Sequence, residues 1–187
     1  MNITLRALAL SAMLGVASLS GAAFAQENPM VGGAAMMADK NIIENAVNSA
    51  DHTTLVAAVQ AAGLVETLSG PGPFTVLAPV NAAFEALPAG TVDTLLKPEN
   101  KEMLSTILAC HVIPAKALAA DITKMVADDG GEHVVDTVGG CKLTLKAADG
   151  KVTVTDENGT VANVTIADVI QSNGVIHVID AVLTPKS

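Results

Sequence analysis

Residues 72–88 read GPFTVLAPVNAAFEALP, and this stretch decides how the core of the chain is built. It holds Phe74 and Phe84, while the sequence contains no Trp, no Tyr and only three Phe in all. Fully burying one such ring is worth about 1.5–3 kcal/mol, so an otherwise aliphatic core should form around these two. Pro79 and Asn81, between the rings, predict a strand, a turn and a short helix capped by Asn81, with both rings entering one core.

The first 25 residues have the pattern of a secretory signal peptide. Arg6 precedes an apolar run at 7–19, and Ala23-Phe24-Ala25 places small residues at the cleavage position. The alternative, a membrane anchor, needs about 20 consecutive apolar residues, and this run is shorter. We therefore expect cleavage after Ala25, no membrane span in the mature chain, and a secreted or periplasmic location.

The mature chain would have 187 − 25 = 162 residues, which is enough for one domain with a substantial core. Residues 26–38 are rich in Gly, Ala and Met and have no periodicity, which predicts a flexible N-terminal arm. A single domain should then run from 39 to 185, followed by a short tail at 186–187.

Acidic residues outnumber basic ones, and the formal net charge is −9. The leader contains Arg6 and no acidic residue, so its removal makes the charge more negative by one unit. Phosphate groups are bound by clustered Lys and Arg side chains. The composition therefore argues against nucleic acid and anionic membrane surfaces as partners.

Two cysteines, Cys110 and Cys141, occur in a chain that is expected to reach an oxidising compartment. This combination favours a disulfide between them, which in the chain-entropy model contributes roughly 3–4 kcal/mol. Two buried free thiols are the alternative. A two-cysteine metal site is less favoured, because no CxxC spacing occurs.

Helical patterns dominate the first half of the domain. Apolar residues repeat at helical spacing over 42–47. Asp51 is placed to cap a second helix that stops at Gly63, and Pro98 suits the first position of a longer helix.

Strand patterns dominate the second half. Residues alternate between apolar and polar over 142–147 and 151–155, and Asp149-Gly150 and Asn158-Gly159 are hairpin turn signals. Residues 175–182, VIHVIDAV, form a near-continuous apolar run of the kind found inside a sheet. Helices followed by antiparallel strands predict the α+β class.

Three segments of the chain resemble one known family. Residues 72–88 and residues 172–185, SNGVIHVIDAVLTP, resemble the two signature boxes of the fasciclin domain. Residues 107–118, ILACHVIPAKAL, resemble its central segment. The resemblance covers about 39–185 and implies a fasciclin-like fold, with helices mainly in the N-terminal half packed on an antiparallel-rich sheet. It also implies a non-enzymatic adhesion or binding module whose partner is a protein or a cell-surface or matrix component.

The residues that carry the resemblance are expected to be structural. Asn173 and Gly174 should form the turn that directs the last strand into the sheet, and His177 should then lie among apolar residues. A neutral histidine bonded to the backbone is the favoured interpretation for His111 and His177, and a ligand or pH-sensing role is the alternative. The full structural set is Phe74, Pro79, Asn81, Phe84, His111, Asn173, Gly174 and His177.

One departure from the family pattern bears on function. The family usually has Tyr-His in the central segment, and this chain has Cys110-His111. In animal members such as keratoepithelin that segment is implicated in integrin adhesion, so the missing Tyr argues against an integrin-type role. A cross-link from Cys110 to Cys141 would replace the missing ring.

A second adhesion motif of those members, Glu-Pro-Asp-Ile-Met, corresponds to residues 166–170, and only Asp168 is identical. Asp168 and Val169 are therefore the candidate partner contacts, and a turn or strand-end role for Asp168 is the alternative. The acidic segment 128–133 is the next candidate surface. It could also bind a cation, although it lacks the ligand spacing of an EF-hand loop.

Sequence patterns for catalysis are missing. There is no GxSxG, HExxH, P-loop or dinucleotide fingerprint, and no candidate nucleophile has an adjacent base in the sequence. We expect no catalytic residue, no bound metal and no cofactor. Two alternatives stay open: a small-molecule or cofactor carrier with Met and His residues lining a pocket, and an enzyme with an unrecognised site.

Overall fold

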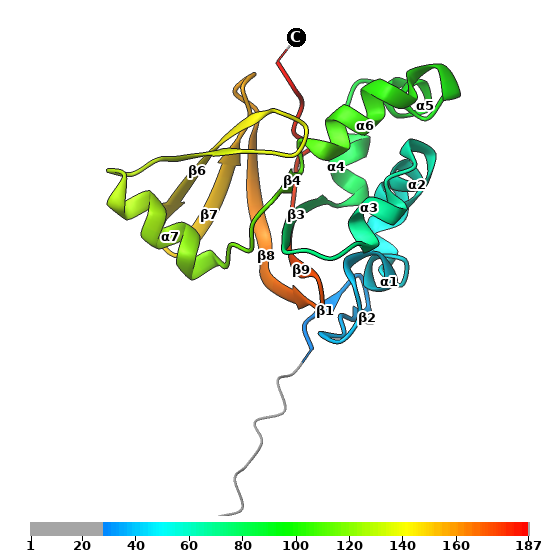
Figure 1. Cartoon of the computed structure of the whole chain (residues 1–187). Helices are drawn as coiled ribbons and strands as arrows, with labels where there is room; N and C mark the ends of the chain where they lie inside the picture. The colour runs from blue at the N-terminus through cyan, green and yellow to red at the C-terminus, as the bar shows by residue number, and fades with distance from the viewer. Residues whose placement is uncertain (1–27, 187) are drawn as a thin grey trace, which may run out of the picture.

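A seven-stranded sheet forms the centre of the molecule, with the strand order β4-β3-β9-β8-β7-β6-β5 (Figure 1). The computed structural model describes residues 28–186, so the expected signal peptide lies outside the described residues. The strands of this sheet are β3 (Phe74–Pro79), β4 (Val112–Ile113), β5 (His133–Asp136), β6 (Lys142–Ala148), β7 (Lys151–Thr155), β8 (Val161–Gln171) and β9 (Gly174–Ile179).

Helices α1 to α6 gather beside β3 and β9, whereas α7 packs against β6 and β7 on the other side of the molecule (Figure 1). Their bounds are α1 (Ile42–Ala46), α2 (Thr53–Ala62), α3 (Val65–Ser69), α4 (Asn81–Glu85), α5 (Thr91–Leu95), α6 (Lys101–Ala109) and α7 (Ala119–Asp128). Single 3₁₀ turns precede α2 and α6. The predicted α+β class is confirmed, while α5 and α7 were not expected from the sequence.

Strand β9 is the interior strand that the apolar run predicts. Every one of its residues is buried, and it pairs in parallel with β3 and antiparallel with β8. The register sets Phe74 opposite Gly174 and Leu77 opposite His177. The two boxes, about 100 residues apart in the sequence, are thus adjacent strands, and this parallel pairing was not predicted.

Two hydrophobic cores lie against the sheet. The helical core gathers side chains from α1 to α6, β3 and β9; Phe84 is buried in it, and Phe74 packs against it while partly exposed. Both rings therefore serve one core, as the sequence predicts. The meander core lies between α7 and strands β6 to β9; its buried residues include Ile122, Val126, Leu143, Leu145 and Val154.

The β6–β7 hairpin follows its turn signal closely. Asp149 and Gly150 both have positive φ, 51° and 73°, as a type I′ turn requires. Strands β6 and β7 pair from Thr144 opposite Thr155 to Ala148 opposite Lys151. The predicted turn therefore sets the register of this antiparallel pair.

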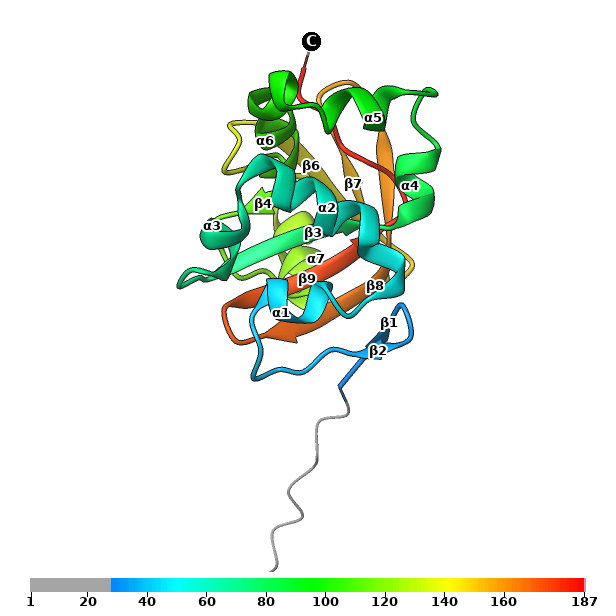
Figure 2. The same ribbon diagram turned by 90° about the vertical axis from the view of Figure 1, so that its right-hand side faces the viewer.

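The segment expected to be a flexible arm packs against the domain where the structure describes it. Strands β1 (Met30–Val31) and β2 (Ala34–Ala35) form a small hairpin, and Val31 and Met36 are only 3% and 2% exposed. Figure 2 shows this hairpin near α1, at the lower end of the described part of the chain. The prediction of a flexible arm is corrected for residues 30–36, because they form this hairpin and its Val31 and Met36 side chains belong to the helical core.

Asn81 caps a helix, but a different one from the helix predicted. Val80 is the N-cap of α4, and the Asn81 Oδ1 instead accepts the Thr54 N–H of α2 at 3.0 Å. The Asn81 amide also donates to the Ala50 carbonyl at 2.8 Å. The expected cap of α2, Asp51, makes no such bond and lies in the 3₁₀ turn ahead of it.

Candidate functional site

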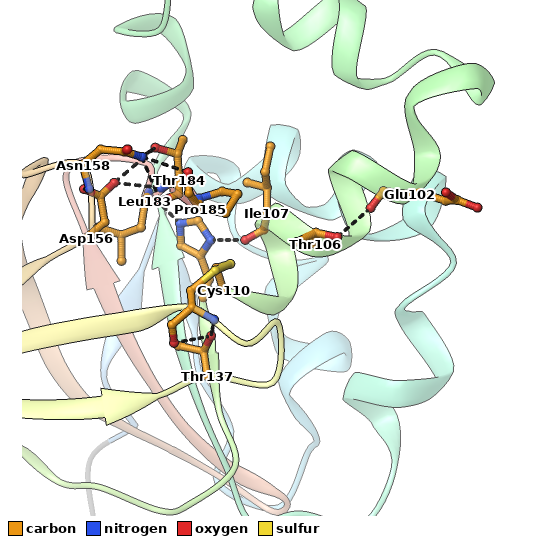
Figure 3. The surroundings of a disulfide bond; sticks show 12 residues. Glu102, Thr106, Ile107, Cys110, Thr137, Asp156, Asn158, Leu183, Thr184 and Pro185 are labelled. Atoms are coloured by element: carbon orange, nitrogen blue, oxygen red, sulfur yellow. Dashed lines mark hydrogen bonds between the residues drawn. A yellow bond between two sulfur atoms is a disulfide. The ribbon is translucent and has the colours of Figure 1, made fainter. Parts of the chain in front are cut away.

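The disulfide joins the end of α6 to the start of β6 (Figure 3). Cys110 is the C-cap of α6, and its Cα lies 5.3 Å from that of Cys141. Both residues are buried, at 0% and 3% exposure. The pairing agrees with the sequence prediction, and the bond covalently links the helical side of the molecule to the strand meander.

His111 follows the disulfide and is held at both ring nitrogens. Its Nδ1 lies 2.8 Å from the Ile107 carbonyl, and its Nε2 accepts the Leu183 N–H at 2.9 Å. Because an N–H can only donate, Nδ1 must carry the proton. Burial lowers the pKa of His111 to about 4, although the Ile107 carbonyl and Asp156 act in the opposite direction. The ring is therefore neutral at physiological pH and fastens the C-terminal segment.

His177 uses the opposite tautomer. Its Nε2 lies 2.8 Å from the Ala117 carbonyl, and its Nδ1 accepts the Asp168 N–H at 3.3 Å. Burial lowers the pKa of His177, partly opposed by the Ala117 carbonyl and by Asp168. With both nitrogens bonded to backbone and the ring 1% exposed, it presents no ligand atom to solvent.

Asp168 and Val169, the candidate partner contacts, lie in an irregular part of β8 where the pairing with β9 shifts register. Asp168 has a positive φ of 58°, and its carboxylate accepts the Ala119 N–H at the start of α7 at 2.7 Å. Val169 is 0% exposed and belongs to the helical core. The expectation that Val169 contacts a partner is therefore wrong, because the bulge turns its side chain inward.

Asn173 joins the turn between β8 and β9 to the start of α1 and to the end of α3. Its Oδ1 accepts the Ile42 N–H at 3.1 Å, and its amide donates to the Leu68 and Gly70 carbonyls at 2.8 and 3.0 Å. The next residue, Gly174, sits so close to the Phe74 backbone that a Cβ would collide with it. The presence of Asn173 and Gly174 in the box is therefore explained by their structural roles.

Sequence reasoning missed two polar groups. Asp156 accepts the Asn158 and Thr160 N–H groups at 2.9 and 2.8 Å and the Thr184 N–H at 2.9 Å, so it ties the β7–β8 turn to the C-terminal segment (Figure 3). An Asp two residues before Asn158-Gly159 is a signal for such an Asx turn.

The second missed group is a Ser–His pair. The Ser49 Oγ lies 2.8 Å from the His52 Nδ1, at the i,i+3 spacing that the sequence contains. The two residues are only 2% and 3% exposed, and burial lowers the pKa of His52. A nucleophile and its base must reach a substrate, and no carboxylate is bonded to this imidazole within residues 28–186. The pair is therefore an internal hydrogen bond.

The acidic segment 128–133 is largely exposed, and its carboxylates already have basic neighbours. Asp128 is 2.7 Å from Lys124, Glu132 is 2.6 Å from Lys146, and Asp129 contacts His133. Among the described residues, no group of three or more His, Cys, Asp or Glu side chains is arranged to hold a metal ion.

An apolar cleft opens between α1, α2 and α3 and reaches down to β3 and β4. Its lining includes Ile43, Val56, Val65, Leu77 and Val112. The enclosed volume is about 30 Å³, whereas sites for drug-sized ligands and cofactors span roughly 300–1,000 Å³. The cleft as it stands has no room for a cofactor.

None of the helices within the described part of the chain is long and apolar enough to cross a membrane.

Several known proteins are similar in sequence to this chain. Protein sll1483 of Synechocystis is 49% identical over 160 residues, which cover 86% of this chain and 82% of that protein. The cell surface glycolipoprotein MPB83 of Mycobacterium bovis is 34% identical over 172 residues, covering 89% and 70%. Pig transforming growth factor-beta-induced protein ig-h3 is 39% identical over 133 residues, 71% of this chain and 17% of that one.

A solved structure agrees with the fold. The fasciclin domain pair of the insect cell adhesion molecule fasciclin I matches with a TM-score of 0.69 at 17% identity, over 77% of this chain and 50% of that one. The family model described as the fasciclin domain matches residues 50–185. This chain belongs to the fasciclin domain family.

Proposed function

We propose that this protein is an exported, non-enzymatic binding module that contacts a protein or a component of the cell surface. The observation that carries the proposal is how the polar residues of the family boxes are used. Asn81, His111, Asn173 and His177 all bond to backbone groups inside the fold, which leaves none of them free for catalysis. This structural use of the box residues supports a role in which the surface of the fold contacts a partner.

The relatives support the same proposal. One carries the words "cell surface" in its name, and the matching solved structure comes from a cell adhesion molecule. Export fits the signal-peptide pattern of the first 25 residues. The carrier alternative receives no support from the cleft, whose enclosed volume is about 30 Å³.

The test is a pull-down with the mature chain, residues 26–187, from the envelope and medium of the cells that produce it. We expect a specific protein or surface component to be retained at moderate salt. An unrelated acidic domain of similar size is the control, because net charge alone attracts cationic material. Recovery of nothing beyond that control would contradict the proposal.

Charge and polarity variants locate the contact. Asp129→Lys with Glu132→Lys changes the acidic segment. Val47→Glu changes the exposed apolar residue that caps the C-terminal end of α1. Asp168→Asn changes the bulge while keeping an acceptor. Each variant must first show the melting temperature of the parent. Loss of the partner with one variant alone assigns the contact to that surface.

A matched control for the acidic segment is Asp93→Lys with Glu99→Lys. It makes the same change in net charge at exposed positions that lie in α5 and in the 3₁₀ turn before α6. Equal weakening by both double variants would show that binding follows total charge rather than a defined surface.

A further inference from the structure

Strand β5 is the last strand of the seven-stranded sheet, so one of its edges has no neighbouring strand in the described part of the chain. The Thr137 N–H donates to the Cys141 carbonyl at 2.9 Å, on the side of β6. Backbone groups alternate in direction along a strand, so those of Val134 and Asp136 point away from β6. Within residues 28–186 no other segment bonds to these backbone groups.

The opposite end of the sheet is not open in this way. Strand β4 has only two residues, both buried, and its Val112 carbonyl accepts the Val138 N–H at 2.8 Å. On β5, by contrast, Asp136 is exposed and Val134 is 56% exposed. Unpaired N–H and C=O groups on an exposed edge strand are a template for a further strand.

Charged side chains form rows on the outer face of β5 and β6. Asp136 lies opposite Lys142 in the register of the two strands, and Glu132 is 2.6 Å from Lys146. Val134 lies between the two acidic residues on the same face. Strand β6 therefore meets an acidic, apolar, acidic row with a basic residue at each end.

We propose that the open edge of β5 binds an extended segment of a partner protein with the pattern basic-x-apolar-x-basic. The two basic side chains lie opposite Glu132 and Asp136, and the apolar side chain lies opposite Val134, which repeats on the open edge the charge pairing that β6 makes on the other. In such strand addition the backbone bonds supply affinity and alternate side chains supply specificity. This inference rests on the proposed function, because it names the surface and the chemistry of that partner.

A second copy of this chain fits the same edge less well. If two antiparallel β5 strands met with Val134 opposite Val134, Glu132 of each copy would lie opposite Asp136 of the other. Like charges directly opposite each other destabilise a strand pair. The register one residue further along places Asp136 opposite Val134, so the carboxylate gains no cationic partner there.

The first test uses the intact mature chain, labelled with ¹⁵N, and the synthetic peptide Thr-Lys-Thr-Val-Thr-Lys-Thr. We expect saturable binding, shifts of the amide signals of residues 132–138, and slower hydrogen exchange at the Val134 and Asp136 N–H groups. The control peptide carries an N-methyl group on its Val nitrogen, which keeps the charge and removes one backbone bond. It should bind at least about threefold more weakly. Equal binding of the two peptides, or unchanged amides at millimolar peptide, would overturn the proposal.

Variants of the edge separate backbone pairing from charge. Val134→Pro removes an N–H that points to solvent, which an edge strand tolerates, and should abolish peptide binding, while Val134→Thr keeps the N–H and should bind like the parent. Asp136→Lys should weaken binding at least about fivefold. Asp93→Lys in α5 makes the same change in net charge and is its control. Equal weakening by the two Lys variants contradicts a defined edge, and the peptide pair decides even where Val134→Pro does not fold.

The pull-down with the mature chain separates this inference from the proposed function. Val134→Pro should lose the partner that Val134→Thr retains. Retention of the partner by both variants overturns the role of the edge and leaves the proposed function standing. Failure of the parent to retain any partner contradicts the proposed function, and the peptide measurements then decide the edge by themselves. A dimer of the parent that Val134→Pro abolishes would make a second copy the occupant, against the proposal.

Discussion

The sheet has two parts whose strands pair in different ways: β3 and β9 on the helical side, and β5 to β8 on the meander side. On the helical side, β3 and β9 pair although about 100 residues separate them, and Asn81 and Asn173 bond segments that are distant in the sequence. On the meander side, β5 to β8 pair in sequence order as consecutive antiparallel neighbours. The helical side therefore depends on long-range contacts, and the meander can form from local turns. Loop-closure entropy makes the first kind of contact slower to form.

The largest effect should come from emptying the helical core. Phe84→Ala removes a ring that is 8% exposed, and we expect a loss of about 3–5 kcal/mol in the free energy of unfolding. Urea unfolding followed by circular dichroism measures it. Val161→Ala, at an exposed position of β8, is the control and should change stability by less than about 0.5 kcal/mol. Similar small losses for both would mean that Phe84 does not anchor this side.

The second largest effect should come from removing the disulfide that links the helical side to the meander side. Cys141→Ala should lower the free energy of unfolding by roughly 2–4 kcal/mol, because the disulfide closes a separation of 31 residues. Reductant should lower the stability of the parent by a similar amount and leave the variant unchanged. A variant as stable as the oxidised parent would show that the two sides hold together without the bond.

The third prediction concerns how the free energy of unfolding depends on pH. It rests on His111, which bridges α6 and the C-terminal segment. Burial lowers its pKa to about 4 in the folded chain from 6.5, so the unfolded chain binds the extra proton between these values. Stability should therefore fall as the pH falls, by about 2 kcal/mol from this residue between pH 7 and pH 5. His52 and His177, whose pKa values are also lowered, act in the same direction.

Urea unfolding at several pH values between 7 and 5 measures this dependence. His133→Gln, at a partly exposed histidine, is the control and should keep most of it. A free energy of unfolding that stays flat across this range would contradict the neutral, buried state of His111.

The smallest effect is expected for the bond by which Asn81 caps α2. Asn81→Ala removes the acceptor for the Thr54 N–H of α2 and should cost about 1 kcal/mol. Asp51→Ala is the matched control, because Asp51 is the nearer candidate in the sequence and makes no cap bond. We expect it to change stability by less than about 0.5 kcal/mol. The reverse order would show that α2 is capped locally. Thermal unfolding of the two variants side by side decides between these outcomes.

The features that the sequence predicts correctly are those that depend on local contacts, as on the meander side. The Asp149-Gly150 turn, the alternating strands that it joins and the buried run of β9 all rest on local patterns. Helix α7 was not predicted, although Ile122 and Val126 have the i, i+4 spacing of a helix face, because the sequence patterns of the second half were interpreted as strands. The parallel pairing of β3 with β9 has no local signal at all.

The prediction for Val169 failed for a related reason. Strand alternation gives the facing of a side chain only while the register is unbroken, and β8 shifts register between Ile166 and Val169. The positive φ of Asp168 re-aims the residue after it into the core. Asn81 shows the same limit, because a side chain near a helix start can serve another helix that only the fold brings close.

The disulfide also sets an order of events for an exported chain. Thiols stay reduced in the cytosol and are oxidised outside it, so Cys110 and Cys141 would join only after translocation. Before that step the meander and the helical side would be joined by the β8–β9 pairing and by packing but not by a covalent cross-link, which would make the precursor easier to keep unfolded for transport. The chain would then gain its last increment of stability in the compartment where it works.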